Sequence, residues 1–232
     1  DIVVVSVFVN PTQFDKQEDL INYPKTIDKD LSLLRAMFCD IVFAPSANEI
    51  YANNVASLAF NFDGLEHQME GKFREGHFNG VGTIVKRLFE IVKPTKAYFG
   101  EKDFQQLQII RNMVKNHKLP VKIVGCDIYR EEDGLAMSSR NARLTESHRD
   151  AAPFIYKTLK EAKIKFGTKN ALEVIDWVEN EFKKQPFLEL EYFEIADEET
   201  LQTIKNKNPK QKYRAFIAVF AGEIRLIDNI SL

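Results

Sequence analysis

The feature that most constrains the fold is a series of short apolar, β-branched runs that alternate with stretches of helical spacing. Short runs of this kind are typical of strands buried on both faces of a parallel sheet. They predict strands over residues 2–9, 40–44, 97–99 and 121–124. The stretches between them predict helices over residues 26–38, 82–92 and 104–117, with a helical turn at 48–51. Strands separated by helices favour βαβ units and a parallel sheet.

After residue 130 the pattern changes. The predicted elements are a long helix from Thr145 to Gly167, a helix over 171–184, a half-exposed strand over 188–195, and a hairpin of 213–221 and 223–227 around Gly222. Helices followed by antiparallel strands indicate a separate, smaller α+β unit. The join is expected in the polar stretch 128–141. The predicted domains are therefore 1–129, the parallel-sheet domain, and 130–232, an α+β lid domain.

Composition and charge exclude several classes of protein. With 32 basic and 34 acidic residues, the net charge of −2 indicates no nucleic-acid partner. The ends of the chain carry no apolar stretch of the ~20 residues that a membrane helix needs, and no signal peptide, so no membrane partner is expected. Cys39 and Cys126 adjoin apolar runs, which predicts buried free thiols and a reducing cytoplasm. A buried strand is an unusual first element, so further chain is expected upstream of Asp1.

The segment Gly100-Glu101-Lys102-Asp103-Phe104-Gln105-Gln106 follows one predicted strand and opens a predicted helix. Ligands of open α/β sheets bind at the carboxyl ends of strands, and a helix start attracts anions. Glycine allows close approach of the backbone, and Lys102 adds a point charge that suits phosphate. The segment predicts a phosphate site, and an ordinary helix cap with solvated charges is the alternative.

A second polar segment lies at the predicted domain join. Ser138, Ser139 and Arg140 place two hydroxyls and a guanidinium within one turn, a set that suits polyphosphate oxygens. The alternative is a polar linker.

Two further segments offer groups for a small substrate. Asn10 and Gln13 follow the first predicted strand, and each carboxamide can both donate and accept. Arg74 and His77 could bind an anion or move a proton. An Asn-Pro turn and a structural histidine are the alternatives.

Taken together, these segments resemble the pantothenate synthetase (pantoate–β-alanine ligase) family over nearly the whole chain. The resemblance is carried by four stretches, read in this order: Phe8-Val9-Asn10-Pro11-Thr12-Gln13-Phe14; Asp19 with Tyr23-Pro24-Lys25-Thr26 and Asp30-Leu31; Phe99 to Gln106; and Asp133 to Asn141. Arginine is commoner in the family at the position of Lys25. The resemblance implies a Rossmann-like domain of the nucleotidyltransferase superfamily with a smaller α+β carboxy-terminal domain, assembled as a cytoplasmic homodimer.

The resemblance also implies roles for single residues. ATP would be contacted by Gly100, Glu101, Lys102, Asp103, Tyr129, Met137, Ser138, Ser139 and Arg140, of which Lys102, Ser138, Ser139 and Arg140 would serve catalysis. Gln13 and Gln106 would hold pantoate, Gln13 would also meet β-alanine, Asn10 would support that pocket, and Asp30 would lie near Mg²⁺. Arg74 and His77 match an Arg-Pro-Gly-His-Phe pattern in which Glu75 replaces the proline. The family's His-x-Gly-His motif lies upstream of Ile2.

The implied reaction joins D-pantoate to β-alanine with ATP and Mg²⁺, by way of a pantoyl adenylate, and releases AMP and pyrophosphate. Two alternatives stay open. One is a nucleotidyltransferase of the same superfamily that acts on a phosphorylated acceptor. The other is an inactive nucleotide-binding protein, should the upstream histidine motif be missing.

Overall fold

The computed structural model of the protein describes residues 1–14, 20–24, 26–52 and 54–232. The chain divides into two compact units, one formed by Asp1–Phe60 with Arg74–Lys93 and the other by Asn61–Phe73 with Pro94–Leu232. The domain boundary expected at residues 129–130 falls inside the second unit and stays a prediction. In the described residues no helix is both long and apolar enough to cross a membrane.

The first unit contains a pair of parallel strands and the helices that connect and follow them. Its elements are β1 (Val4–Ser6), the 3₁₀ helix η1 (Pro11–Gln13), α2 (Ile27–Ala36), β2 (Ile41–Phe43), α3 (Ala47–Tyr51) and α5 (His77–Val92). β1 pairs with β2 in parallel, with Val5 opposite Val42. A capping box between Ser46 and Glu49 starts α3. The predicted order of elements in this unit is confirmed.

The second unit holds another parallel pair and an antiparallel sheet. Its elements are η2 (Leu65–His67), α4 (Met69–Phe73), β3 (Lys96–Gly100), η3 (Glu101–Asp103), α6 (Phe104–Asn116), β4 (Lys122–Cys126), η4 (Ser139–Arg143), α7 (Glu146–Ala151), α8 (Phe154–Phe166), α9 (Ala171–Phe182), β5 (Glu189–Asp197), β6 (Tyr213–Ala221) and β7 (Ile224–Ser231). β3 and β4 are parallel, with Tyr98 opposite Val124. The predicted α/β class with a smaller antiparallel carboxy-terminal part is confirmed.

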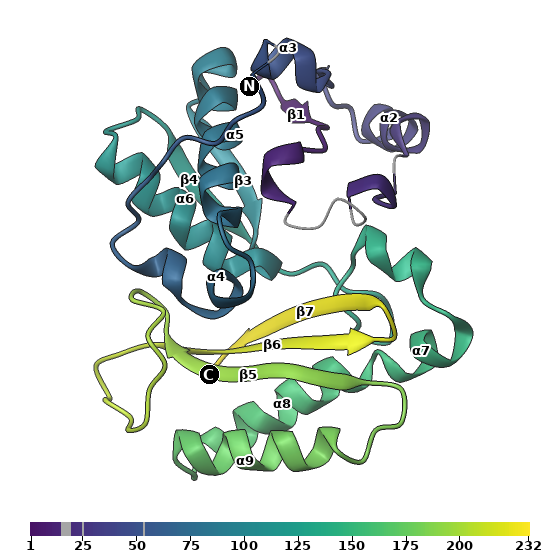
Figure 1. The fold of residues 1–232 in the computed structure, drawn as a ribbon, viewed down its shortest axis with the longest axis vertical. Coiled ribbons are helices and arrows are strands. Elements are labelled where there is room, and N and C mark those ends of the chain that lie inside the picture. Colours follow the sequence, from purple (N-terminus) through teal and green to yellow (C-terminus); the bar gives the residue numbers. More distant parts are fainter. Residues whose placement is uncertain (15–19, 25, 53) are drawn as a thin grey trace. The chain divides into compact units, whose positions relative to one another are not determined.

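The antiparallel sheet has the strand order β5-β6-β7 and is covered on one face by α8 and α9 (Figure 1). Ile155, Leu159 and Val174 on these helices pack against Ile195 and Ile217 of the sheet, and all five are at most 1% exposed. On the other face Phe216 packs against Phe104, with ring centroids 6.0 Å apart. Because β6 is central and covered on both faces, eight of its nine residues are buried.

Several sequence expectations need correction. The long helix expected from Thr145 to Gly167 is two helices, α7 and α8, because Pro153 has no N–H group to continue the first. The helix expected from Gly82 begins at His77. The last strand reaches Ser231 rather than Ile227.

The first strand and the cysteines also differ from expectation. β1 spans only three residues instead of 2–9, and Ile2 and Val3 are 75% and 50% exposed. The residues of β1 are therefore not buried on both faces of the two-stranded sheet that β1 forms with β2. Both thiols are free as expected, but Cys126, the last residue of β4, is exposed, and Cys39, which precedes β2, is only partly buried.

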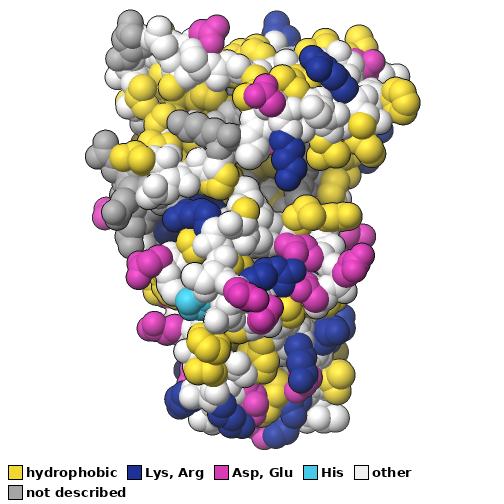
Figure 2. All heavy atoms as spheres, turned by 90° about the vertical axis from the view of Figure 1, so that its right-hand side faces the viewer, with side chains coloured by type: hydrophobic (Ala, Val, Ile, Leu, Met, Phe, Trp, Pro, Cys, Tyr) yellow, Lys and Arg dark blue, Asp and Glu magenta, His cyan; other side chains and the backbone are white. Residues whose placement is uncertain are grey.

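The surface carries charges of both signs. Figure 2 shows Lys and Arg side chains interspersed with Asp and Glu on the face that it draws. This mixture agrees with the near balance of 32 basic and 34 acidic residues.

Candidate active site

The turn after β1 is organised by the side chain of Asn10. Asn10 is 2% exposed and caps η1, where its Oδ1 accepts hydrogen bonds from the backbone N–H and the hydroxyl of Thr12. The same oxygen accepts from the Tyr51 hydroxyl at 2.6 Å, while Nδ2 donates to the carbonyl of Gly80 at 3.1 Å. Burial raises the pKa of Tyr51, which keeps that hydroxyl a donor. The carboxamide of Asn10 is thus engaged in holding the turn that carries Gln13.

Arg74 and His77 hold the backbone of Gln13. His77 Nδ1 lies 2.8 Å from the Gln13 carbonyl oxygen, and Arg74 donates to the same oxygen at 3.2 Å. Arg74 also lies 3.2 Å from His77 Nε2. Since a guanidinium can only donate, Nε2 must accept and Nδ1 must carry the proton that is donated to Gln13. Both side chains therefore contact the carbonyl of Gln13, whereas the side-chain amide of Gln13 forms no hydrogen bond with any other described residue.

Gly80 allows α5 to approach the Gln13 turn closely. A β-carbon at this position would lie 2.2 Å from the Thr12 carbonyl oxygen and 2.9 Å from the Gln13 nitrogen. The backbone of η1 would have to move to admit any other residue. The glycine is required by this close approach, and no sequence signal marked it.

Gly80→Ala is therefore expected to lower the free energy of unfolding by roughly 1–3 kcal/mol, the usual cost of overpacking a filled site. Urea unfolding would measure the change. Gly100→Ala is the matched control, because a β-carbon there meets nothing within 4 Å and its φ of −68° suits alanine. Equal stability of the Gly80 variant and the wild type would show that the turn moves freely.

Asp30, the predicted neighbour of Mg²⁺, lies in the first turn of α2. Its carboxylate accepts a hydrogen bond from the Thr26 hydroxyl at 3.2 Å. In the described part of the chain no group of three or more His, Cys, Asp or Glu side chains is placed to hold a metal ion. A single carboxylate fits Mg²⁺ only when substrate phosphates complete the coordination. Asp19 and Lys25 lie outside the described residues.

The second unit carries the predicted phosphate segment as expected: β3 ends at Gly100, η3 covers Glu101–Asp103 and α6 begins at Phe104. Asn229 donates from Nδ2 to the carbonyl oxygens of Glu101 and Lys102, both at 2.9 Å. The Glu101 carboxylate lies 3.4 Å from the Arg214 guanidinium. The Lys102 ammonium forms no close ion pair with a described residue, although its charge lies near enough to the Asp228 carboxylate to lower the pKa of that group.

The two adjacent glutamines of α6 differ in whether their side-chain amides are hydrogen-bonded within the fold. Gln105 is 4% exposed, and its amide donates to the carbonyls of Leu65 and Gln68 and accepts from the N–H of Glu70. Gln106 is partly exposed, and its amide forms no hydrogen bond with another described residue. Of this pair, the residue predicted to hold pantoate is the one whose amide is open to a ligand.

The polar segment that contains Ser138, Ser139 and Arg140 follows a turn that is closed by backbone hydrogen bonds. Met137 donates from its backbone to the carbonyl of Tyr129 at 3.0 Å, and Arg130 forms a bridge with Ala136. Tyr129 and Met137 are 73% and 51% exposed. Ser138 caps η4, where its hydroxyl accepts from the N–H of Arg140 at 3.2 Å, while Ser139 and Arg140 continue the turn.

The strand β7 contacts both η3 and η4 and so links the two predicted nucleotide segments. Arg130 donates to the Asp228 carboxylate through both terminal nitrogens, at 2.7 and 2.9 Å. Burial raises the pKa of Asp228, and Arg130 opposes that rise. Asp228, Asn229 and Arg214 were missed in the sequence. The adjacent polar residues in the strand β7 could have marked the first two, but no sequence signal marked Arg214 on β6.

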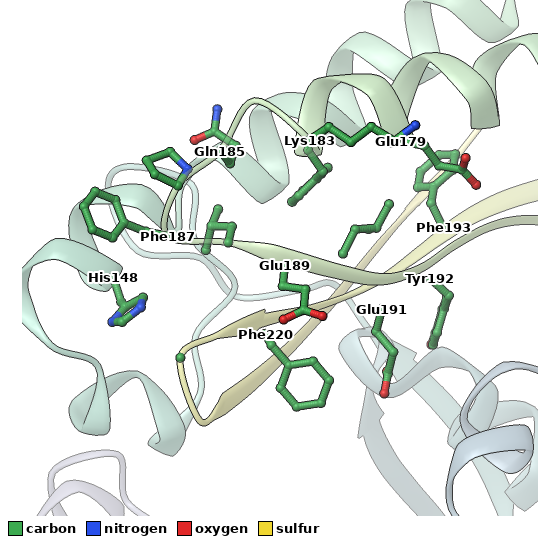
Figure 3. Close-up of a pocket in the computed structure, with 15 residues that line it drawn as sticks. His148, Glu179, Lys183, Gln185, Phe187, Glu189, Glu191, Tyr192, Phe193 and Phe220 are labelled. Atoms are coloured by element: carbon green, nitrogen blue, oxygen red, sulfur yellow. The ribbon is translucent and has the colours of Figure 1, made fainter.

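A pocket of about 640 Å³ lies elsewhere in the second unit (Figure 3). It is bordered by the end of α9, the first half of β5, His148 and the β6–β7 turn. The His148 ring packs against Phe187, and its Nδ1 lies 2.6 Å from the Thr145 hydroxyl. None of the predicted site residues lines it.

Polar turns at the carboxyl ends of parallel strands are typical of α/β proteins that bind small ligands there. The family model of pantoate–β-alanine ligase matches residues 1–231. The chain belongs to the pantoate–β-alanine ligase family and is an enzyme of the ligase class.

Relatives and solved structures agree with this assignment. The pantothenate synthetase of Flavobacterium psychrophilum is 59% identical, over 100% of this chain and 83% of that protein. The one from Christiangramia forsetii is 57% identical, over 100% and 82%. A crystal structure of pantothenate synthetase from Thermus thermophilus matches with a TM-score of 0.92 and 40% identity, covering 99% of this chain and 83% of that one. A Francisella tularensis pantoate–β-alanine ligase, crystallised with β,γ-ATP and β-alanine, matches with a TM-score of 0.82 and 33% identity, covering 100% and 79%.

Proposed function

We propose that the protein condenses D-pantoate with β-alanine, using ATP, and releases pantothenate, AMP and pyrophosphate through a pantoyl-adenylate intermediate. The observation that carries the proposal is the family match over residues 1–231. The proposal includes a cytoplasmic location and a homodimer. Sedimentation in solution would test the homodimer.

The chemistry explains why ATP is needed. A carboxylate reacts poorly with an amine, because its oxide is a bad leaving group. Transfer of AMP to the pantoate carboxylate breaks the bond between the α- and β-phosphates and supplies AMP as leaving group. The β-alanine amine then attacks the acyl carbon and forms the amide. Each step depends on in-line positioning and on neutralising the charge that develops on phosphate oxygens.

Polar and charged side chains of the second unit suit the first step. The Lys102 ammonium and the donors of Ser138, Ser139 and Arg140 would bind phosphate oxygens, next to backbone contacts from Gly100 to Asp103, Tyr129 and Met137. Asp30 would bind Mg²⁺ only when the phosphates of ATP supply further ligands to the ion. When bound, Mg²⁺ supplies further neutralisation of phosphate charge.

The free carboxamides suit pantoate. Gln13 and Gln106 each offer a donor and an acceptor that are not used within the described structure, and Gln13 would also meet β-alanine. Asn10, Arg74 and His77 would act indirectly, since they hold the turn of Gln13.

AMP formation measured with the whole natural protein tests the function. It is expected to require pantoate and β-alanine together. Release of pyrophosphate with a phosphorylated acceptor and without β-alanine would indicate a nucleotidyltransferase instead. Binding of ATP without turnover would indicate an inactive nucleotide-binding protein.

The pantoate pocket should also reject an acid that lacks the substrate's hydroxyl groups. A deoxy analogue leaves the Gln13 or Gln106 amide unpaired, so its kcat/KM is expected to fall by roughly 10-fold or more. A branched-chain acid of similar volume serves as the comparison. Turnover of the analogue at the rate of pantoate would refute the assignment of these glutamines.

A further inference from the structure

Two neighbouring polar residues on β7, Asp228 and Asn229, are almost completely buried. Asp228 is 4% exposed and Asn229 is 1% exposed. Buried polar side chains in a strand are costly unless their hydrogen bonds are satisfied. The side chains of both residues are hydrogen-bonded, and each contacts a different segment that is predicted to bind the nucleotide.

Asn229 holds the segment after β3. Its Nδ2 donates to the carbonyls of Glu101 and Lys102, and its Oδ1 accepts from Arg214 at 2.6 Å. Arg214 also pairs with Glu198 at 2.9 Å, and its guanidinium lies 3.9 Å from the centre of the Phe104 ring. The start of α6 is thereby fastened to β6 and β7 at several points.

Asp228 holds the other segment. Its carboxylate binds Arg130 through both oxygens, and Arg130 in turn donates to the carbonyl of Gly134 at 3.1 Å and stacks 3.6 Å over the Tyr156 ring. Arg130 directly follows Tyr129, whose carbonyl binds Met137. The Asp228 carboxylate is therefore one of the groups that hold the loop leading to Ser138, beside Arg149, which pairs with Glu131 and Asp133.

We propose that Asp228 and Asn229 are positioning residues that fix the Glu101–Lys102 turn and the Tyr129–Arg140 loop relative to each other. Successive side chains of a strand point to opposite faces, so one dipeptide reaches both segments. The inference rests on the proposed function, because that function gives the two segments one shared ligand, the phosphates of ATP. A site held in this way is preorganised for charge that develops during reaction.

The test replaces the Asn229 amide by a carboxylate of the same shape. In Asn229→Asp the oxygen that replaces Nδ2 faces the two carbonyl oxygens and repels them, while the contact with Arg214 is kept. The KM for ATP is expected to rise at least ~10-fold, the size of effect seen when a group that orients a ligand-binding residue is lost. The KM for β-alanine should stay within about twofold of wild type.

Asn180→Asp is the matched control, because Asn180 is exposed on α9 and its side-chain oxygen accepts a hydrogen bond from Lys183. Asp228→Asn is the second variant, should Asn229→Asp not fold. It keeps the shape and one acceptor for Arg130, so a smaller rise of the KM for ATP is expected. Thermal unfolding with and without ATP accompanies the kinetics, since a ligand-orienting role reduces the stabilisation by ATP.

An unchanged KM for ATP in both variants, with equal stabilisation by ATP, would overturn the inference and leave a purely structural role. Should the wild type fail to make pantothenate, the proposed function fails, and the inference is then decided by ATP stabilisation alone. Stabilisation of the wild type and the control, but not of the variants, would support it. Absence of stabilisation in all proteins would overturn it as well.

Discussion

Lys102→Ala is expected to slow pantoate-dependent release of pyrophosphate by about 10²- to 10³-fold, or ~3–4 kcal/mol of barrier, which is the usual cost of losing one strong transition-state donor. The reason lies in the contrast between Lys102 and its neighbours. Its backbone is fixed by Asn229, yet its ammonium forms no ion pair among the described residues. A lysine whose backbone is fixed and whose ammonium forms no close ion pair is suited to stabilise the negative charge that develops when the α- to β-phosphate bond breaks.

The same contrast predicts little effect on folding. Because the ammonium forms no close ion pair with a described residue and acts on the Asp228 carboxylate only at longer range, the free energy of unfolding should change by less than ~1 kcal/mol. Single-turnover measurement of pyrophosphate separates the chemical step from binding. Lys115→Ala is the matched control, since Lys115 is exposed near the end of α6, the helix that follows η3. Equal single-turnover rates for Lys102→Ala and the wild type would exclude Lys102 from the reaction.

Local sequence signals were sufficient for most elements of the fold. The alternation of β-branched runs with helical spacing predicted β2, β3, β4, α6 and α9 to within a few residues. The turn at Gly100–Asp103 was predicted because a strand, a glycine and a helix start are adjacent in the chain. Contacts between neighbours in sequence decide such features.

Features that depend on distant residues were not predictable in this way. Nothing in the pair Gln105 and Gln106 shows which amide is buried, because the partners of Gln105 come from residues 65–70. The partner of Arg130 is 98 residues away, at Asp228. A single sequence shows that these residues are polar, but not that they meet. The positioning of the site is therefore a property of the folded structure.

The cluster around Glu70 is such a long-range feature, and Glu70→Ala is expected to lower the free energy of unfolding by about 3 kcal/mol, at the low end for breaking a buried ion pair. Glu70 binds Arg225, 155 residues away, through both carboxylate oxygens at 2.8 Å. Tyr192 donates to the same carboxylate at 2.7 Å, and burial raises the pKa of that tyrosine, so it stays a donor. Because Arg225 also binds Glu191 at 2.8 Å, it keeps one partner, which limits the loss.

A double-mutant cycle isolates this interaction from general damage. Unfolding of Glu70→Ala, Arg225→Ala and the double variant should give a coupling energy of roughly 1–3 kcal/mol. Glu181→Ala removes a carboxylate from an exposed pair with Lys184 and is expected to cost at most ~1 kcal/mol. Additive losses in the cycle would mean that α4 is held by packing alone. Coupling of the expected size would mean that charge pairing holds residues 61–73 to the carboxy-terminal sheet, because the cycle cancels the packing that each single substitution removes.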